Sequence, residues 1–103
     1  MKRFKFKDIK FKKRTEPRGG IQAILNYGKY NLSIVRDRYS YGGKEGLYEI
    51  GAFLNNTMIE LPGITEEGDT VKGWLSEDDI TGILLKMVTI SGVDKPKQVA
   101  IAE

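Results

Sequence analysis

Residues 36–46 carry the side chains best suited to binding chemistry, because cations, phenols and glycines are crowded into one short segment. The segment holds two arginines, two tyrosines and three glycines between two stretches that are predicted to be β-strands. A simple connection between strands needs only polar turn residues. We therefore expect this loop to form an exposed surface that holds a partner. The candidate partner-binding residues are Arg36, Arg38, Tyr39, Tyr41, Gly42, Gly43 and Lys44.

The glycine pair in this loop also suggests a backbone nest for phosphate, with Lys44 beside it to balance the charge. The spacing differs from that of a P-loop, because Glu45 follows Lys44 where a P-loop has Ser or Thr. The segment also precedes a predicted strand, whereas a phosphate loop precedes a helix. Glycines that only let the chain reverse direction explain the same pattern. The sequence leaves these interpretations open.

Tyr39 and Tyr41 are two residues apart, so an extended loop would point both side chains to one side. Phenol rings in that arrangement stack on nucleic-acid bases or anchor protein interfaces. Arg36 and Arg38 have the opposite parity. Because Tyr and Arg dominate protein–protein hot spots as well, composition alone does not separate the two kinds of partner.

The sequence contains no histidine and no cysteine. Serine–histidine triads, thiol nucleophiles and cysteine-ligated metals are thereby excluded. The neighbouring carboxylates Glu66, Glu67 and Asp69 lack the twelve-residue ligand pattern of an EF-hand. We therefore expect a protein that is not an enzyme, with no catalytic residues, no metal and no cofactor.

Charge is distributed unevenly along the chain. Residues 1–19 carry nine lysines and arginines against two acidic residues, whereas residues 59–80 carry seven acidic residues against one lysine. Such a basic segment is typical of a polyanion contact, and it is also typical of the solvated face of an edge strand. Both interpretations stay open. The candidate nucleic-acid-binding residues are Lys5, Lys7, Lys10, Lys12, Lys13 and Arg14.

Hydrophobic periodicity predicts an α+β fold, with an antiparallel, hairpin-built sheet of about four to six strands and one C-terminal amphipathic helix packed on one face. A basic first strand is predicted over 4–12, with a β-bulge near Asp8 or with pairing only from Ile9 onward. A hairpin of 21–27 and 30–36 has Gly28 at the first position of a type II′ turn.

A second hairpin is predicted from 47–54 and 57–61, with Asn55 and Asn56 in a type I′ turn. Residues 62–72 are predicted to form a loop, and Trp74 is expected to close the core in front of the helix. Ser76 is the expected helix N-cap, with Asp79 completing a capping box. The buried helix face is expected to contain Ile80, Ile83, Leu84, Met87 and Val88.

The 103 residues are expected to form a single domain. Its parts are a basic strand or tail over 1–19, the sheet and helix over 20–92, and a short strand or tail over 93–103. The chain contains no apolar run long enough to span a bilayer, and no signal peptide, so we expect a cytoplasmic protein without a membrane partner. A homodimer through an edge strand or the helix stays open.

Three short sequence patterns carry a family resemblance: Ser40-Tyr41-Gly42-Gly43, then Gly46-Leu47-Tyr48-Glu49, and the segment from Gly68 to Ile80 around Gly73-Trp74-Leu75. They are similar to patterns in a group of small, mostly uncharacterised bacteriophage proteins, over roughly residues 27–88. The resemblance implies a phage gene product in a bacterial host cytoplasm. Such proteins are often accessory factors that bind and redirect host components, and the resemblance implies no reaction.

Two functions follow as hypotheses from the sequence. The first is a small phage accessory protein that binds and modulates a host or phage protein through the loop of residues 36–46. The second is a nucleic-acid-binding module, in which the basic N-terminal segment contacts phosphates and the loop tyrosines stack on bases.

Overall fold

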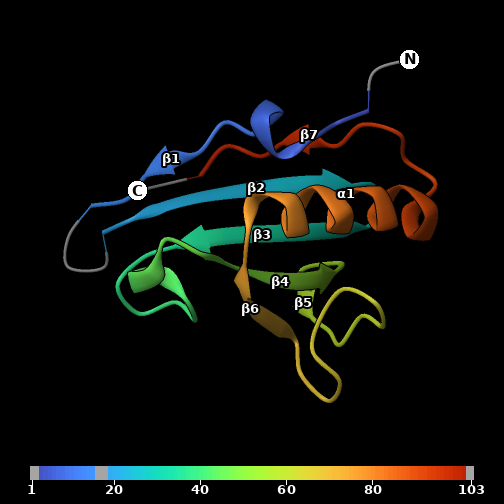
Figure 1. Ribbon diagram of the computed structural model, residues 1–103. Helices are drawn as coiled ribbons and strands as arrows, with labels where there is room; N and C mark the ends of the chain where they lie inside the picture. The colour runs from blue at the N-terminus through green and yellow to red at the C-terminus, as the bar shows by residue number, and fades with distance from the viewer. Residues whose placement is uncertain (1–2, 16–18, 102–103) are drawn as a thin grey trace.

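A computed structural model describes residues 3–15 and 19–101 (Figure 1). Within these ranges the chain forms seven strands, one α-helix and two 3-10 turns. Their order is η1 (Phe6–Asp8), β1 (Lys12–Lys13), β2 (Ile21–Tyr27), β3 (Tyr30–Arg36), η2 (Gly43–Glu45), β4 (Tyr48–Leu54), β5 (Thr57–Met58), β6 (Val71–Leu75), α1 (Glu77–Ser91) and β7 (Lys97–Gln98).

All strand pairs are antiparallel, and the seven-residue strands β2, β3 and β4 form the centre of one sheet (Figure 1). The outer edge of β2 pairs with β1 and β7, and the outer edge of β4 pairs with β5 and β6. The predicted α+β class is confirmed. The described sheet has more strands than the expected four to six, since β1, β5 and β7 contribute only two residues each.

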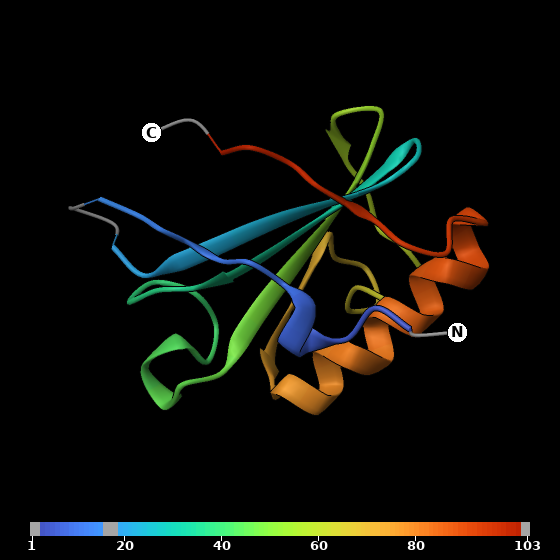
Figure 2. The same ribbon diagram turned by 90° about the horizontal axis from the view of Figure 1, so that it is seen from above.

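The core lies between one face of this sheet and helix α1, which packs along it (Figure 2). Side chains alternate along the central strands, so that Leu25, Leu32 and Ile50 are buried on this face. The helix contributes Ile80, Ile83, Leu84 and Met87, as the periodicity predicted, with Val88 half-buried beside them. Each fully buried side chain of this size stabilises the fold by ~1.5–3 kcal/mol.

Both hairpin turns follow their local sequence. Gly28 has φ 72°, the sign that the first position of a type II′ turn requires. Asn55 and Asn56 have φ 49° and 71°, which confirms the type I′ turn between β4 and β5. These turns fix the register of β2 with β3 and of β4 with β5.

The helix begins at the residue that the sequence predicted. The Asp79 backbone N–H donates to Ser76 Oγ over 3.1 Å, and the Ser76 backbone N–H donates to Asp79 Oδ2 over 2.9 Å. Hydrogen bonds from Ser76 lower the pKa of the Asp79 carboxyl. At the other end, Gly92 has φ 75° and donates to Val88 O over 2.8 Å.

The strand predicted over 4–12 is wrong, because Phe6–Asp8 forms the 3-10 turn η1 and pairing begins only at Lys12. Asp8 Oδ2 accepts the Lys5 backbone N–H over 2.9 Å, which caps this turn. The turn, and not a β-bulge, explains why the apolar side chains change parity near Asp8. Phe6 and Phe11 then both pack on the Tyr48 ring, with centroids 5.1 and 5.6 Å from it.

The loop predicted over 62–72 ends earlier than expected, because β6 begins at Val71 and pairs with β4. The pairing has a register shift between Tyr48 and Ile50. Likewise, β5 covers only the first two residues of the strand predicted over 57–61. Strand β6 leads directly into the cap of α1 and places Trp74 at the sheet edge.

The hydroxyl of Tyr27 gives the first testable prediction. The side chain is 1% exposed, and its hydroxyl has no hydrogen-bond partner among the described residues. Tyr27→Phe removes a desolvated polar atom, so we expect the free energy of unfolding at pH 7 to stay the same or to rise by up to ~1 kcal/mol. Chemical denaturation measures it, and a clear loss of stability would contradict the assignment.

The same variant has a predicted pH dependence. Burial raises the pKa of Tyr27 from 10.0 to about 12, because the folded protein favours the neutral phenol. Ionisation of this phenol therefore does not affect the free energy of unfolding below pH 10.0. As the pH rises from there toward about 12, the unfolded chain ionises more readily than the folded protein, and the free energy of unfolding falls. Tyr27→Phe should show a weaker alkaline loss of stability than the wild type.

Candidate functional site

The loop that follows β3 is organised by the buried carboxylate of Asp37. Its Oδ1 accepts the backbone N–H groups of Tyr39 and Ser40, over 2.8 and 2.7 Å. Ser40 Oγ in turn accepts the Asp37 backbone N–H over 2.9 Å. These reciprocal bonds turn the chain sharply and fix the backbone on which Tyr39 and Tyr41 are carried.

Arg14 holds the other carboxylate oxygen of Asp37. Its Nη1 lies 2.7 Å from Asp37 Oδ2, and its Nε and Nη2 donate to Gln22 Oε1. The Asp37 side chain is 0% exposed, so the carboxylate of this ion pair is removed from water, whereas the Arg14 side chain is partly exposed. Arg14 is one of the predicted phosphate-binding cations, and here its guanidinium ties the N-terminal segment to the loop.

Gly42 and Gly43 are explained by close packing inside the loop. Gly42 has φ 86°, and a Cβ atom on Gly43 would collide with the carbonyl oxygen of Asp37. Gly43 N donates to Ser40 O over 3.0 Å and starts the turn η2. Chain reversal therefore accounts for both glycines without a bound phosphate.

The loop is docked against β6 by direct backbone contact. Trp74 N donates to Tyr41 O over 3.1 Å. A Cβ atom on Gly73 would overlap Tyr41 Cβ, and one on Gly42 would lie 3.0 Å from Trp74 Cα. On the other side, Tyr41 N donates to Glu49 Oε1 over 3.0 Å. Two glycines thus allow two segments distant in sequence to bring Tyr41 beside Trp74.

Tyr39, Tyr41 and Trp74, hereafter the aromatic surface, are 65%, 59% and 61% exposed. The expectation that Trp74 closes the core is wrong, because β6 turns its side chain to solvent. Trp74 also has φ 60°, a left-handed conformation that costs a side-chain-bearing residue ~1–2 kcal/mol. Large aromatic side chains exposed at such a position are typical of a binding surface.

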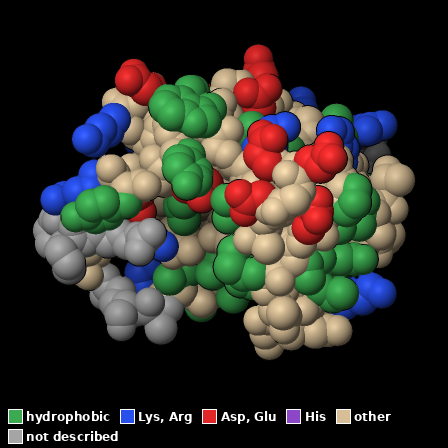
Figure 3. All heavy atoms as spheres, turned by 90° about the horizontal axis from the view of Figure 1, so that it is seen from below, with side chains coloured by type: hydrophobic (Ala, Val, Ile, Leu, Met, Phe, Trp, Pro, Cys, Tyr) green, Lys and Arg blue, Asp and Glu red, His purple; other side chains and the backbone are tan. Residues whose placement is uncertain are grey.

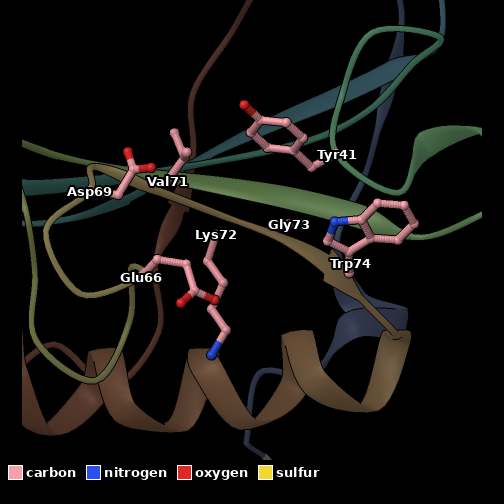
Figure 4. Close-up of a pocket in the computed structure, with 7 residues that line it drawn as sticks. All are labelled: Tyr41, Glu66, Asp69, Val71, Lys72, Gly73 and Trp74. Atoms are coloured by element: carbon pink, nitrogen blue, oxygen red, sulfur yellow. The ribbon is translucent and has the colours of Figure 1, made fainter.

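Two hollows flank Trp74. The first, of about 320 Å³, lies between the loop and β6, and Figure 4 shows Tyr41 and Trp74 at one end of it with Glu66 and Asp69 toward the other. The second, of about 390 Å³, lies between β6 and α1 and includes Asp78 and Asp79. Figure 3 shows hydrophobic side chains beside a group of acidic ones on this face.

The cations of the predicted loop site have different environments. Arg36 Nη1 donates to the Tyr48 hydroxyl over 3.1 Å, and the guanidinium carbon lies 5.1 Å from the Tyr48 ring centroid. Burial raises the pKa of Tyr48, and the charge of Arg36 opposes that rise. Arg36 therefore supports the packing of the loop base, while Arg38 and Lys44 have exposed side chains.

The five N-terminal lysines of the nucleic-acid hypothesis are exposed on the β1 side of the sheet. Lys12 and Lys13 form the edge strand β1, and Lys12 Nζ donates to Ile101 O over 2.7 Å. Sequence reasoning placed Lys2 and Arg18 in the same basic segment, but both lie outside the described residues.

The sequence predicted the loop tyrosines as candidate binding residues but did not include Trp74 on β6 among them. The acidic residues on either side of β6 were assigned to a loop and to helix capping. The available signal was Gly73, because a glycine inside a short strand indicates close approach of another backbone.

Comparison with protein-family models, with curated proteins and with solved structures finds no match to this chain. Among residues 3–15 and 19–101, no three acidic side chains gather in a way that could hold a metal ion. No helix in that part of the chain has the length and apolar character needed to cross a membrane.

The contact between Gly73 and Tyr41 leads to the second prediction. Gly73→Ala forces the loop away from β6, so we expect a loss of ~1–3 kcal/mol in the free energy of unfolding. Gly82→Ala is the control, because a Cβ atom there meets nothing within 4 Å and alanine favours the helix by up to ~1 kcal/mol. Urea denaturation of both variants tests this, and equal stabilities would contradict the proposed close contact.

Proposed function

We propose that this protein is a binding module that captures another protein through the aromatic surface, without catalysis. The observation that carries the proposal is the pairing of Tyr41 with Trp74, which are brought together from distant segments and are both more than half exposed. Trp and Tyr are the residue types that contribute most to protein–protein binding energy.

The arrangement of the loop supports this proposal because it reduces the entropic cost of binding. The Asp37 carboxylate accepts two backbone N–H groups of the loop and forms an ion pair with Arg14, and β6 fixes the loop a second time through Tyr41 O. A surface that is already ordered loses little conformational freedom when a partner binds.

The family resemblance of residues 27–88 suggests what the partner is. If the chain is a phage accessory protein in the bacterial cytoplasm, the partner is a host or phage protein whose activity is modulated by capture. This identification rests on the sequence patterns around Tyr41, Leu47 and Trp74 alone.

The third prediction tests partner capture. The triple variant Tyr39→Ala, Tyr41→Ala, Trp74→Ala should lose discrete protein partners from a nuclease-treated bacterial lysate, measured by affinity purification and mass spectrometry. The matched control is Leu85→Ala, Val99→Ala, which truncates two other exposed apolar side chains. Circular dichroism must show that both variants remain folded. Capture by the triple variant at the wild-type level would refute the proposal.

A nucleic-acid-binding function is the second candidate, and one observation favours it. The pair between Arg14 and Asp37 places the exposed lysines of β1 at the same end of the sheet as the tyrosine loop. A single strand could then contact the lysines with its phosphates and stack on Tyr39.

Salt dependence distinguishes this candidate and is the fourth prediction. If five lysines contact phosphates, affinity for a labelled oligonucleotide should fall by ~100-fold between 50 and 200 mM salt. Lys12→Gln, Lys13→Gln should reduce both affinity and salt slope, whereas Lys29→Gln, Lys95→Gln should not. Fluorescence anisotropy measures both. Binding that is insensitive to salt and to the β1 lysines would exclude this function.

A further inference from the structure

We infer that the captured segment is basic, with lysine or arginine side chains seated in the two hollows on either side of Trp74. This inference rests on the proposed protein-binding function and specifies the chemistry of the partner. Both hollows share Lys72, Gly73 and Trp74, so Trp74 stands between them on β6. An extended segment that crosses β6 at Trp74 therefore reaches both.

The side chains that line the two hollows give them an acidic character. They contain four carboxylates, against the ammonium groups of two lysines. The carboxylates are Glu66, Asp69, Asp78 and Asp79, and the lysines are Lys72 and Lys86. Lys86 Nζ is already engaged, since it donates to Gly63 O over 3.0 Å. Figure 4 shows that Lys72 points toward α1 and away from the aromatic rings.

The carboxylates differ in how far they are engaged within the molecule. Asp79 accepts the Ser76 N–H of the helix cap, and Asp69 Oδ1 accepts the Thr70 N–H over 2.6 Å. Glu66 and Asp78 are exposed and accept no hydrogen bond from the side chains or backbone of the described residues. One such carboxylate lines each hollow, and each is available to a cation from outside.

The aromatic rings complete a site for a cationic side chain. The alkyl part of a lysine or arginine packs on the apolar surface of Tyr41 and Trp74, and its charged end is attracted to a ring face. Glu66 and Asp69 line the same hollow and supply the counter-charge. A nucleic-acid phosphate is repelled by the same carboxylates, so this face favours a basic protein segment.

The experiment uses Trp74 as its own reporter, because it is the only tryptophan in the chain. A capped hexapeptide of alternating lysine and arginine is titrated while Trp74 emission is recorded. Capped hexapeptides of glutamate and of serine serve as comparators. We expect a saturable change with the basic peptide alone, and weaker binding at high salt. Absence of a saturable change, or an equal change with the glutamate peptide, would overturn the inference.

The charge variants test the role of the hollow directly. Glu66→Gln, Asp69→Asn should weaken binding of the basic peptide by about fivefold. Glu67→Gln, Asp94→Asn is the matched control, because it removes the same charge from exposed residues that do not line the two hollows. Equal affinities of the two double variants would show that only the overall charge matters and would overturn the assignment.

The lysate experiment separates this inference from the function on which it rests. If Glu66→Gln, Asp69→Asn captures the partner as the wild type does while the aromatic triple variant does not, the binding function stands and the basic segment is refuted. If the triple variant also captures the partner, the binding function itself fails. Loss of capture in both, with the Glu67 and Asp94 control intact, supports both.

Discussion

The buried carboxylate of Asp37 is the interaction on which the aromatic surface depends. It contacts the loop backbone at Tyr39 and Ser40 and holds Arg14 from the N-terminal segment. A buried carboxylate without these partners would be strongly destabilising. The same contacts that satisfy its charge therefore also fix the loop, the edge strand β1 and the base of β2 relative to one another.

The elements predicted correctly are those whose signals are local. The type I′ turn at Asn55 and Asn56, the capping box of Ser76 and Asp79, and the helical spacing from Ile80 are each complete within a few residues. Local signals also led to the wrong prediction of an N-terminal strand, because the alternation of Phe4 and Phe6 with lysines fits a strand locally. The 3-10 turn has the local cap from Asp8 and also a tertiary contact, in which the Phe6 backbone N–H donates to Thr81 Oγ1 on α1.

The candidate site was predictable only in part, because its two halves depend on sequence signals of different range. The tyrosines of the loop are recognisable by composition, whereas the partnership of Tyr41 with Trp74 joins residues that lie far apart in the chain. A tryptophan in front of a helix cap is more often buried, so the expectation for Trp74 followed the general rule. The left-handed conformation at Trp74 breaks that rule, and composition does not reveal it.

The rest of the molecule is stable enough to tolerate the strained backbone conformation of Trp74. In the sheet, the turns and α1 the local sequence preferences agree with the tertiary packing, and these elements share a continuous core from Leu25 to Met87. Such a core tolerates the ~1–2 kcal/mol that a left-handed tryptophan costs at an edge strand. Trp74 contributes little burial in return, since its ring is mostly exposed. A conformation that costs stability without burying the side chain supports the proposed role of the exposed ring in binding.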